Sequence, residues 1–436
     1  MRRHLESCYE LTIICSLPAR RYTESSMRYG CLLVLFLTRL FATSPALDPA
    51  KSGLDSNRLA QIPVRMKSFV DRGVAAGVVT LVARHGAVAE FDAAGYQNLE
   101  TRKPMAQDTI FQIMSMTKPL TGIGIMMLME EGKLGINDPV ERRLPEFRGQ
   151  MVIDNRNPDG SVVLRRPVRP ITIRDLMTHT SGMLDVMPEA IKDHYQRMNL
   201  TLAEAVSIFS QQPLEFEPGT KWKYSSPGIG VLGRIIEVTS GQSYEEFMKE
   251  RLFRPLEMKD SFFFPPTEKQ NRIAMVYQSK DGKLIPAGDN ILGGDPARLR
   301  KGARYPAPEW GLFSTAADLD AVYQMMLNGG SLQGRRYLSR ASVELMTQIE
   351  TGGIPNSGWV GGGGYGLTWE VIKGFPGTLL LLSPGAYGHS GAFGTQGWID
   401  PAKDMIRIML VQRSDGGIDE LKSAFMTMAG SAIAVE

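Results

Sequence analysis

The spacing of apolar residues predicts a helix and then two strands near the start of the main body of the chain. Between residues 56 and 74, apolar side chains recur every three or four positions among charged ones, which is typical of an amphipathic helix. Residues 77–83 form an apolar run, and a second β-prone run, residues 87–94, follows the turn at His85-Gly86. Strands joined by so short a turn pair in the antiparallel sense.

The middle of the chain carries helical patterns. The most apolar of them begins at Ser115 and runs to Glu131, with Gly132 placed to end the helix. Asn157-Pro158-Asp159-Gly160 predicts a tight turn between two β-prone stretches. Further helices are expected at residues 172–177, 202–209 and 231–238.

Strand patterns return near the end of the chain, after a glycine-rich stretch at 353–364 that is expected to be a loop. A last amphipathic helix is expected near 420–434. The predicted strands are residues 365–372, 378–382, 387–393, 396–400 and 405–411.

A sheet whose strands come from both ends of a chain requires the middle to be inserted as a separate lobe. We therefore expect an α/β fold of the α+β type, in which helices flank an antiparallel sheet. Residues 47–132 and 301–436 would form this α/β domain, and residues 133–300 a mostly helical lobe. Active sites often lie in the cleft between two such lobes.

The first 46 residues differ from the rest of the chain. All three cysteines lie there, so the remainder can build neither a disulfide nor a thiol nucleophile. Arg28, the apolar run 31–37 and the small residues 42–46 follow the order of a secretory signal peptide beginning at Met27, although Arg39 interrupts it. We expect a periplasmic or secreted protein; the alternative is a cytoplasmic protein with an irregular start.

Charge gives no indication of a polyanionic partner. The full chain has 49 basic and 46 acidic residues, and without residues 1–46, which hold six Arg and three Glu, both counts are 43. The cluster Arg165, Arg166 and Arg169 is too small for a nucleic-acid surface, which needs a broad basic face. No apolar run reaches the ~18 residues that span a bilayer. We expect neither a nucleic-acid partner nor a membrane span.

Ser115-Met116-Thr117-Lys118, at the head of the apolar helix, is the first candidate for chemistry. The spacing of three places Ser115 and Lys118 one turn apart on one helix face. A serine hydroxyl needs a base to become a nucleophile, and a desolvated lysine, whose pKa is lowered, can act as that base. Ser-x-x-Lys alone is a weak signal, since an N-cap serine followed by a surface lysine gives the same pattern.

Three further segments strengthen the signal. They are Thr178-His179-Thr180-Ser181-Gly182, then Tyr224-Ser225-Ser226 after Phe216-Glu-Pro-Gly-Thr220, and His389-Ser390-Gly391. With Pro255-Leu-Glu-Met258 and Trp310-Gly-Leu-x-Ser-Thr-Ala316, these segments follow one another in the order of a known family. From about residue 55 to its end, the chain resembles the serine β-lactamase-related superfamily, in its branch of class C β-lactamases, DD-peptidases and family VIII carboxylesterases.

The resemblance implies a role for each matching residue. Ser115 would be the acylated nucleophile, and Lys118 and Tyr224 would share the general-base work. The backbone N–H groups of Ser115 and Ala392 would form the oxyanion hole. Ser226, His389, Ser390, Gly391 and Trp310 would contact the substrate.

Two departures from the β-lactamase pattern favour an ester substrate. The family's asparagine two residues after the tyrosine is replaced by Ser226, and the lysine that opens its third motif by His389. A mostly neutral histidine binds a substrate carboxylate less well than an ammonium does. Lys118, as a positive neighbour, is also expected to lower the pKa of Tyr224.

We therefore expect a serine hydrolase that cleaves small carboxylic esters without a cofactor or metal. The alternatives are a β-lactamase or D-amino-acid peptidase, and a non-catalytic binding protein with the same fold. The chain has no Gly-x-Ser-x-Gly motif, and His4, His85, His179 and His194 lack metal-ligand spacing. His179 is expected to be a structural hydrogen-bonding residue beside the site. Met114 and Met116, next to the nucleophile, are candidates for an apolar acyl pocket.

Overall fold

The structure is a computed structural model that describes residues 47–185, 198–288, 295–296, 300–355, 357–358, 363–374 and 381–434. Residues 44–436 form one compact unit. The predicted export segment, residues 1–46, lies outside the described residues, as does most of the predicted strand 378–382.

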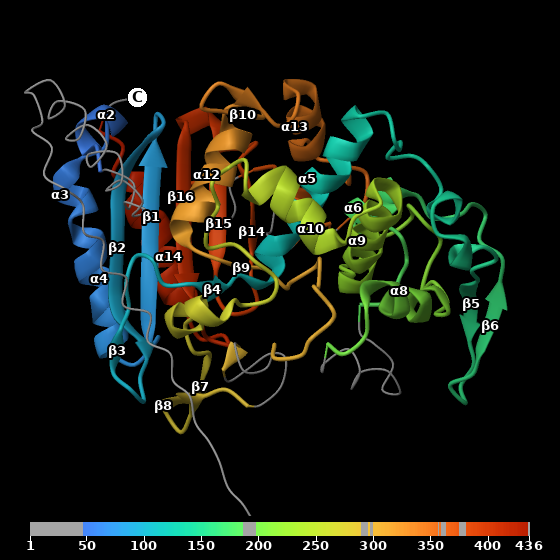
Figure 1. Ribbon diagram of the computed structural model, residues 1–436, viewed down its shortest axis with the longest axis horizontal. Coiled ribbons are helices and arrows are strands. Elements are labelled where there is room, and N and C mark those ends of the chain that lie inside the picture. The colour runs from blue at the N-terminus through green and yellow to red at the C-terminus, as the bar shows by residue number, and fades with distance from the viewer. Residues whose placement is uncertain are drawn as a thin grey trace, which may run out of the picture. The chain divides into compact units, whose positions relative to one another are not determined.

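An eight-stranded antiparallel sheet forms the centre of this unit (Figure 1). Strands from the two ends of the chain meet inside this sheet, where β1 pairs with β16 and Leu81 lies opposite Ile408. In spatial order the strands are β12 (Gly363–Tyr365), β13 (Glu370–Ile372), β14 (Tyr387–Ser390), β15 (Gln396–Asp400), β16 (Met405–Val411), β1 (Gly77–Arg84), β2 (Ala87–Asn98) and β3 (Lys103–Pro104).

Helices cover both faces of the sheet, so every residue of β1 is buried. Side chains of a strand alternate between its faces. Val78 and Val82 pack with the terminal helices α3 (Ser56–Leu59), α4 (Gln61–Asp71) and α14 (Asp419–Ser431). Val79 and Leu81 belong to the larger core on the other face, which includes α12 (Ala316–Leu327) and α5 (Thr117–Glu130).

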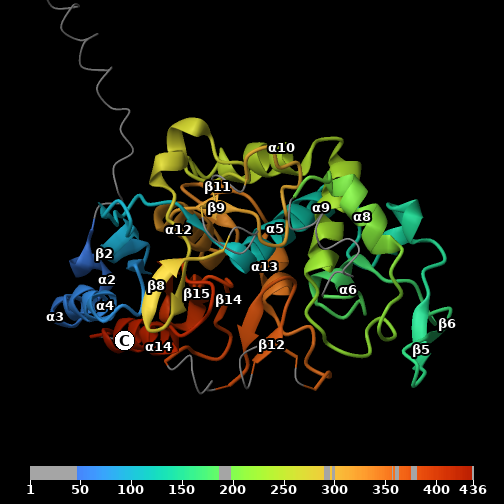
Figure 2. The same ribbon diagram turned by 90° about the horizontal axis from the view of Figure 1, so that it is seen from below.

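Residues between α5 and α12 hold short helices and small two-stranded sheets, which lie beside the main sheet and at its edge (Figure 2). Of the helices, α9 (Ser226–Ser240) packs against α5, α6 and α8. The other helices of this stretch are α6 (Ile173–Met177), α8 (Leu202–Ser210) and α10 (Tyr244–Met248), while α2 (Pro49–Ser52) precedes it and α13 (Arg340–Thr347) follows it. Two small sheets lie wholly between α5 and α12: β5 (Val152–Arg156) with β6 (Val162–Arg165), and β7 (Tyr277–Lys280) with β8 (Lys283–Pro286). Two others include strands outside that stretch: β4 (Phe111–Gln112) with β9 (Phe313–Ser314), and β10 (Ser331–Leu332) with β11 (Arg335–Arg336).

The predicted antiparallel sheet flanked by helices is confirmed, and the structure corrects individual elements. Residues 365–372 were expected to form one strand, but they form β12, a turn and β13. Thr368 turns the chain with a positive φ of 67°, and the Gly366 N–H donates to the Trp369 carbonyl (2.8 Å). Residues 365–372 read as one apolar run because the turn between the two strands is buried as fully as the strands are. The division into an α/β domain and an inserted lobe at 132/133 and 300/301 stays a prediction.

Candidate active site

Ser115 lies in a single 3-10 turn, Met114–Met116, that connects β4 to α5. Met114, immediately before it, has a φ of 52°, a conformation that costs a non-glycine residue about 1–3 kcal/mol. The Thr117 hydroxyl holds this turn, since it donates to the Met114 carbonyl (2.6 Å) and accepts from the Leu312 N–H (3.2 Å). The turn places Ser115 at the start of a helix, half-buried, with its N–H in the first turn, where helical donors lack partners.

Lys118 lies one turn further along and is fully buried. Its Nζ is 3.0 Å from Ser115 Oγ and 2.8 Å from the backbone carbonyl oxygen of Glu309. Burial lowers the pKa of Lys118 to about 7, against a smaller opposing effect of the carboxylates of Glu309 and Asp185. A large fraction of Lys118 is therefore neutral at neutral pH and able to accept a proton from Ser115.

Tyr224 completes the group around Ser115. Its ring lies under Lys118, with Nζ 4.6 Å from the ring centroid, and its hydroxyl is hydrogen-bonded to the Ser115 side chain. Ser225, which follows, caps α9: its Oγ accepts from the Gly228 N–H (3.2 Å) and donates to the Leu184 carbonyl (2.8 Å). The cap holds Tyr224 at the entrance to the helix.

The expected lowering of the Tyr224 pKa is wrong. Burial raises the pKa of Tyr224 above its usual range, the hydrogen bond with Ser115 only partly opposes this, and carboxylates nearby raise it further. The desolvation of a phenolate thus outweighs any attraction to Lys118. Tyr224 is a neutral phenol that can donate its proton.

The third motif lies beside Ser115, at the end of β14. A Cβ atom on Gly391 would lie 2.4 Å from the Ile113 carbonyl oxygen and 2.1 Å from Thr395 Oγ1, so only glycine allows this approach. Thr395 Oγ1 also donates to the Ile113 carbonyl (3.0 Å). Ala392 follows Gly391 and is exposed. Its backbone N–H pairs with no backbone oxygen of the described residues. Its role in an oxyanion hole stays a prediction.

His179 and His389 are buried and are bridged by the hydroxyl of Tyr365. The Ser225 N–H donates to His179 Nδ1 (3.1 Å), so a neutral His179 carries its proton on Nε2, which faces Tyr365 Oη at 3.2 Å. His389 Nδ1 lies 2.7 Å from the Ser390 carbonyl oxygen, which can only accept. His389 Nε2, 3.1 Å from Tyr365 Oη, is therefore the acceptor of the Tyr365 proton. The hydrogen bonds run in one direction, from His179 through Tyr365 to His389.

Both histidines of this array are neutral. Burial is the main cause and Lys118 the second: together they lower the pKa of His389 to about 3 and that of His179 well below its usual value. The predicted structural role of His179 agrees with these contacts. Both ring nitrogens of His389 are used within the protein, which leaves no N–H for a substrate carboxylate. Substrate binding by His389 stays a prediction without geometric support.

The remaining predicted residues surround this group at different depths. Ser226 and Ser390 are half-buried, whereas Trp310 is buried, with the Arg300 guanidinium 4.9 Å from its ring. Ser226 is the first residue of α9, and its N–H points to Asp185 Oδ1 at 3.5 Å. Met114 and Met116 are part of the core, so the candidate acyl pocket is not formed by exposed methionines.

Three contributors were missed by sequence reasoning: Glu309, Tyr365 and Asp185. Glu309 precedes the recognised Trp310 and acts through its backbone carbonyl, which has no sequence signature. Tyr365 lies in the run taken for a single strand. Asp185 lies three residues after Gly182, where the segment Thr178–Gly182 ends, and its charge could have been noted there.

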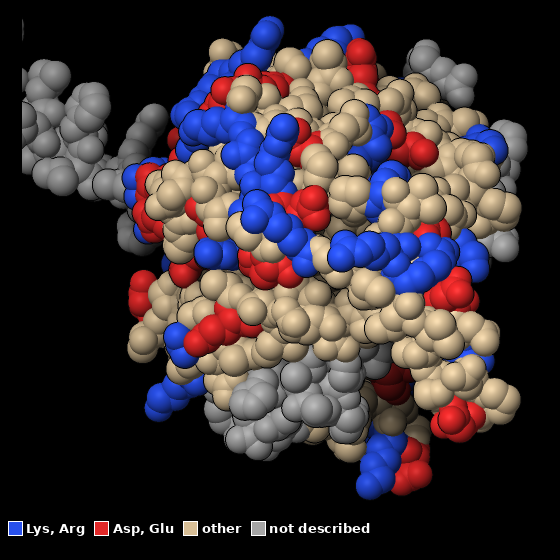
Figure 3. All heavy atoms as spheres, turned by 90° about the vertical axis from the view of Figure 1, so that its right-hand side faces the viewer, with Lys and Arg blue, Asp and Glu red and all other residues tan. Residues whose placement is uncertain are grey.

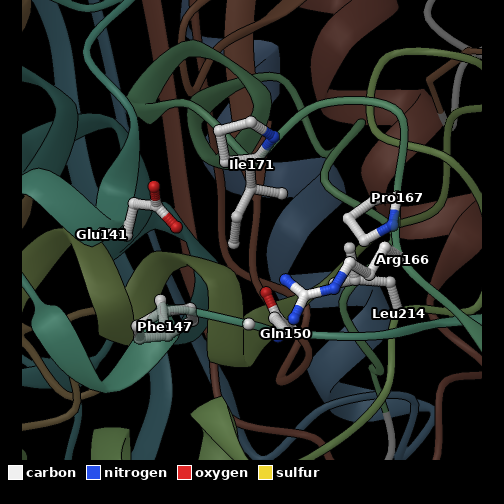
Figure 4. Close-up of a pocket in the computed structure, with 9 residues that line it drawn as sticks. Glu141, Phe147, Gln150, Arg166, Pro167, Ile171 and Leu214 are labelled. Atoms are coloured by element: carbon white, nitrogen blue, oxygen red, sulfur yellow. The ribbon is translucent and has the colours of Figure 1, made fainter.

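A separate cavity of about 130 Å³ lies among the elements between α5 and α9 (Figure 4). Glu141 and Arg166 reach it from different walls, and Phe147, Ile171 and Leu214 supply apolar surface. None of Ser115, Lys118 and Tyr224 lines it. The face of the molecule in Figure 3 carries Lys and Arg side chains interspersed with acidic ones.

Within the described ranges, no three His, Cys, Asp or Glu side chains come together as metal ligands. No helix of the described part has both the length and the apolar content that a membrane span requires.

A helix-borne serine with a buried lysine one turn away and a tyrosine on the same hydroxyl defines a serine hydrolase on an antiparallel-sheet fold. The profile of the Beta-lactamase family matches residues 65–426. The chain belongs to this family.

Named relatives agree with this assignment. Protein Rv1367c of Mycobacterium tuberculosis is 31% identical over 374 residues, which cover 82% of this chain and 90% of that protein. Esterase EstB of Burkholderia gladioli is 29% identical over 398 residues, covering 80% and 96%. Among solved structures, the hydrolase EstCE1 superposes with a TM-score of 0.71 at 24% identity, covering 87% of this chain and 99% of that one. The last comparison shows that the fold is shared.

Proposed function

We propose that the protein is a carboxylesterase that cleaves small esters through an acyl-enzyme on Ser115. The observation that carries the proposal is the 3.0 Å contact between Ser115 Oγ and Lys118 Nζ, a buried amine whose pKa is lowered to about 7. Such a pair supplies a nucleophile and its base without a metal or cofactor. The family's DD-peptidase and esterase members leave the substrate class open, so the preference for esters rests on further arguments.

Each proton transfer of the reaction can be assigned to a residue of the site. Ser115 Oγ attacks the ester carbonyl carbon while its proton passes to Lys118 Nζ. The oxyanion accepts hydrogen bonds from the N–H groups of Ser115 and Ala392. The C–O bond then breaks, and the leaving alkoxide takes the proton of the Tyr224 hydroxyl, which Lys118 replaces. Water then attacks the acyl carbon and passes one proton to Lys118 Nζ. The bond from the acyl carbon to Ser115 Oγ breaks, Ser115 Oγ takes that proton back from Lys118, and the acid leaves.

Neutral His389 supports an ester in preference to a β-lactam or an acyl-peptide. Those substrates present a carboxylate that a lysine at this position would bind, and an uncharged, fully hydrogen-bonded imidazole offers it nothing. Esters need no such anchor and have better leaving groups than amides. The relatives EstB and lovastatin esterase of Penicillium rubens are named as esterases, the latter matching over 58% of this chain.

Hydrolysis of p-nitrophenyl acetate, compared with that of a chromogenic cephalosporin and a D-alanyl-D-alanine peptide, tests the substrate class. We expect the acetate to be the best substrate by kcat/KM. A cephalosporin or peptide rate above the ester rate would favour the β-lactamase or peptidase alternative. The double variant His389→Lys, Ser226→Asn should raise the cephalosporin-to-ester ratio; an unchanged ratio would mean that these positions do not set the preference.

Mass spectrometry after exposure to an irreversible serine phosphonate separates an enzyme from a binding protein. We expect one adduct on Ser115 in the wild type and none in Ser115→Ala, which should unfold at the same temperature. An unlabelled wild type would favour the non-catalytic alternative.

A further inference from the structure

A carboxylate that the catalytic scheme does not use, that of Asp185, lies at the edge of the site. Asp185 is half-buried, and its Oδ1 is 3.5 Å from the Ser226 N–H at the start of α9. The Ser225 hydroxyl, which donates to the Leu184 carbonyl (2.8 Å), ties the same loop to the residue after Tyr224. Asp185 is therefore placed against Ser226, which is two residues after the proton donor Tyr224.

The charge of Asp185 reaches the reacting groups. It opposes the lowering of the Lys118 pKa and adds to the raising of the Tyr224 pKa. No described residue forms an ion pair with it: Lys223, the cation nearby, pairs with Glu215 instead. Burial raises the pKa of Asp185, and the Ser226 N–H and the two lysines oppose this. A carboxylate held in this way attracts a cation that enters the site.

No side-chain cation of the third motif balances this charge. His389, where the family has lysine, is neutral and buried. Of the cations described above, Lys118 is only partly charged near pH 7, Lys223 is paired with Glu215, and the Arg300 guanidinium lies against the ring of Trp310. The carboxylate of Asp185 therefore attracts a cationic group of a substrate that binds beside it and repels an anionic one.

We infer that Asp185 is a specificity-determining residue that selects substrates whose acyl group carries an ammonium, such as amino-acyl esters, over neutral and anionic ones. This inference rests on the proposed acylation of Ser115. The attraction needs only that the ammonium lie within a few ångströms of Asp185 when the carbonyl meets Ser115. The Ser226 N–H, which points to Asp185, belongs to a residue only two positions after Tyr224.

Three p-nitrophenyl phosphonates of one chain length, ending in trimethylammonium, tert-butyl or carboxylate, test the inference at pH 8. The first two groups have the same shape and differ in charge. The rate of Ser115 labelling is followed by intact-protein mass spectrometry. We expect the wild type to react with the cation about five- to tenfold faster than with the tert-butyl compound, and with the carboxylate more slowly still, in the range of modest surface electrostatics.

Asp185→Asn keeps the shape of the side chain and should bring the cation-to-neutral ratio close to one. Asp185→Lys should reverse the order of the cation and the carboxylate. Asp71→Asn is the matched control, because it removes the same charge from the exposed face of α4, and it should keep the wild-type ratio.

Labelling by all three reagents at equal rates in the wild type, or an unchanged ratio in Asp185→Asn, would overturn the role of Asp185 and leave the esterase proposal intact. Labelling by none of them would remove Ser115 as the nucleophile, and with it both proposals. Thermal unfolding of each variant shows whether a changed ratio reflects charge or a damaged fold.

Discussion

Replacing Lys118 with methionine should abolish esterase activity and, at the same time, make the protein more stable. Lys118 is fully buried, and its pKa falls from the ordinary 10.5 to about 7. Each pKa unit corresponds to about 1.4 kcal/mol, so holding a protonated Lys118 in the folded protein costs about 5 kcal/mol. Met has a similar length and no charge to desolvate.

Part of the stability gained by removing the buried charge is lost again. Met cannot donate to the Glu309 carbonyl or to Ser115, and a buried acceptor without a partner costs about 1–3 kcal/mol. Below pH 7, we therefore expect the free energy of unfolding of Lys118→Met to exceed that of the wild type by about 2–4 kcal/mol.

The pH dependence identifies the cause. Between about pH 7 and pH 10.5 the unfolded chain binds a proton at Lys118 that the folded protein has released, so wild-type stability rises with pH relative to the variant. Urea unfolding at pH 6, 8 and 10 measures the difference at each pH. Lys67→Met, which removes an exposed lysine paired with Asp71, is the control and should give a flat difference.

A Lys118→Met protein less stable than the wild type at pH 6, or a difference independent of pH, would refute the reasoning. Either result would mean that Lys118 is stabilised as an ammonium and is not poised as a base.

Four further results are expected. The kcat/KM for p-nitrophenyl acetate should fall below about pH 7 as Lys118 is protonated, and an acid limb set by a group near pH 5 would point to another base. Tyr224→Phe should lower kcat by several orders of magnitude with a smaller effect on KM, and an alkaline limb in the wild type below pH 9 would contradict a neutral phenol. Gly391→Ala should lower kcat about 100-fold, since its methyl group would displace the strand end beside Ser115; steady-state kinetics that match the wild type would show that this strand end is not needed. Deleting residues 1–46 should leave esterase kinetics and thermal unfolding of the purified protein unchanged, and an unfolded product would mean that this segment is structural.

The fold was largely predictable because burial leaves a periodic pattern wherever an element has one covered face. The strand predicted at 405–411 coincides with β16, and the helix predicted at 420–434 overlaps α14. The start of α9 was placed at Val231, five residues late, because Ser226, Pro227 and two glycines carry little helical propensity. Capping by Ser225 and burial against α5 and α6 outweigh that propensity.

The site could be predicted only as far as its motifs reach. The pairing of Ser115 with Lys118 follows from helix geometry, and Tyr224 was placed by resemblance. The protonation states depend on how deeply each group is buried, and no sequence motif encodes burial. Burial of Tyr224 raised its pKa, where the sequence had led us to expect a lowered one. The array through Tyr365 joins residues 179, 365 and 389, whose distances in sequence hide their contact.

The pairing of β1 with β16 has a consequence for how the protein is made. These two neighbouring strands inside the sheet lie more than 300 residues apart in the chain, so Leu81 can pair with Ile408 only after nearly the whole chain has been synthesised. During synthesis, the turn with Ser115 and helix α9 leave the ribosome well before β16, the strand that pairs with β1. We expect the newly made chain to stay unfinished until the last residues emerge, with slow closure typical of long-range pairing. During that interval it would depend on chaperones to shield its apolar strands.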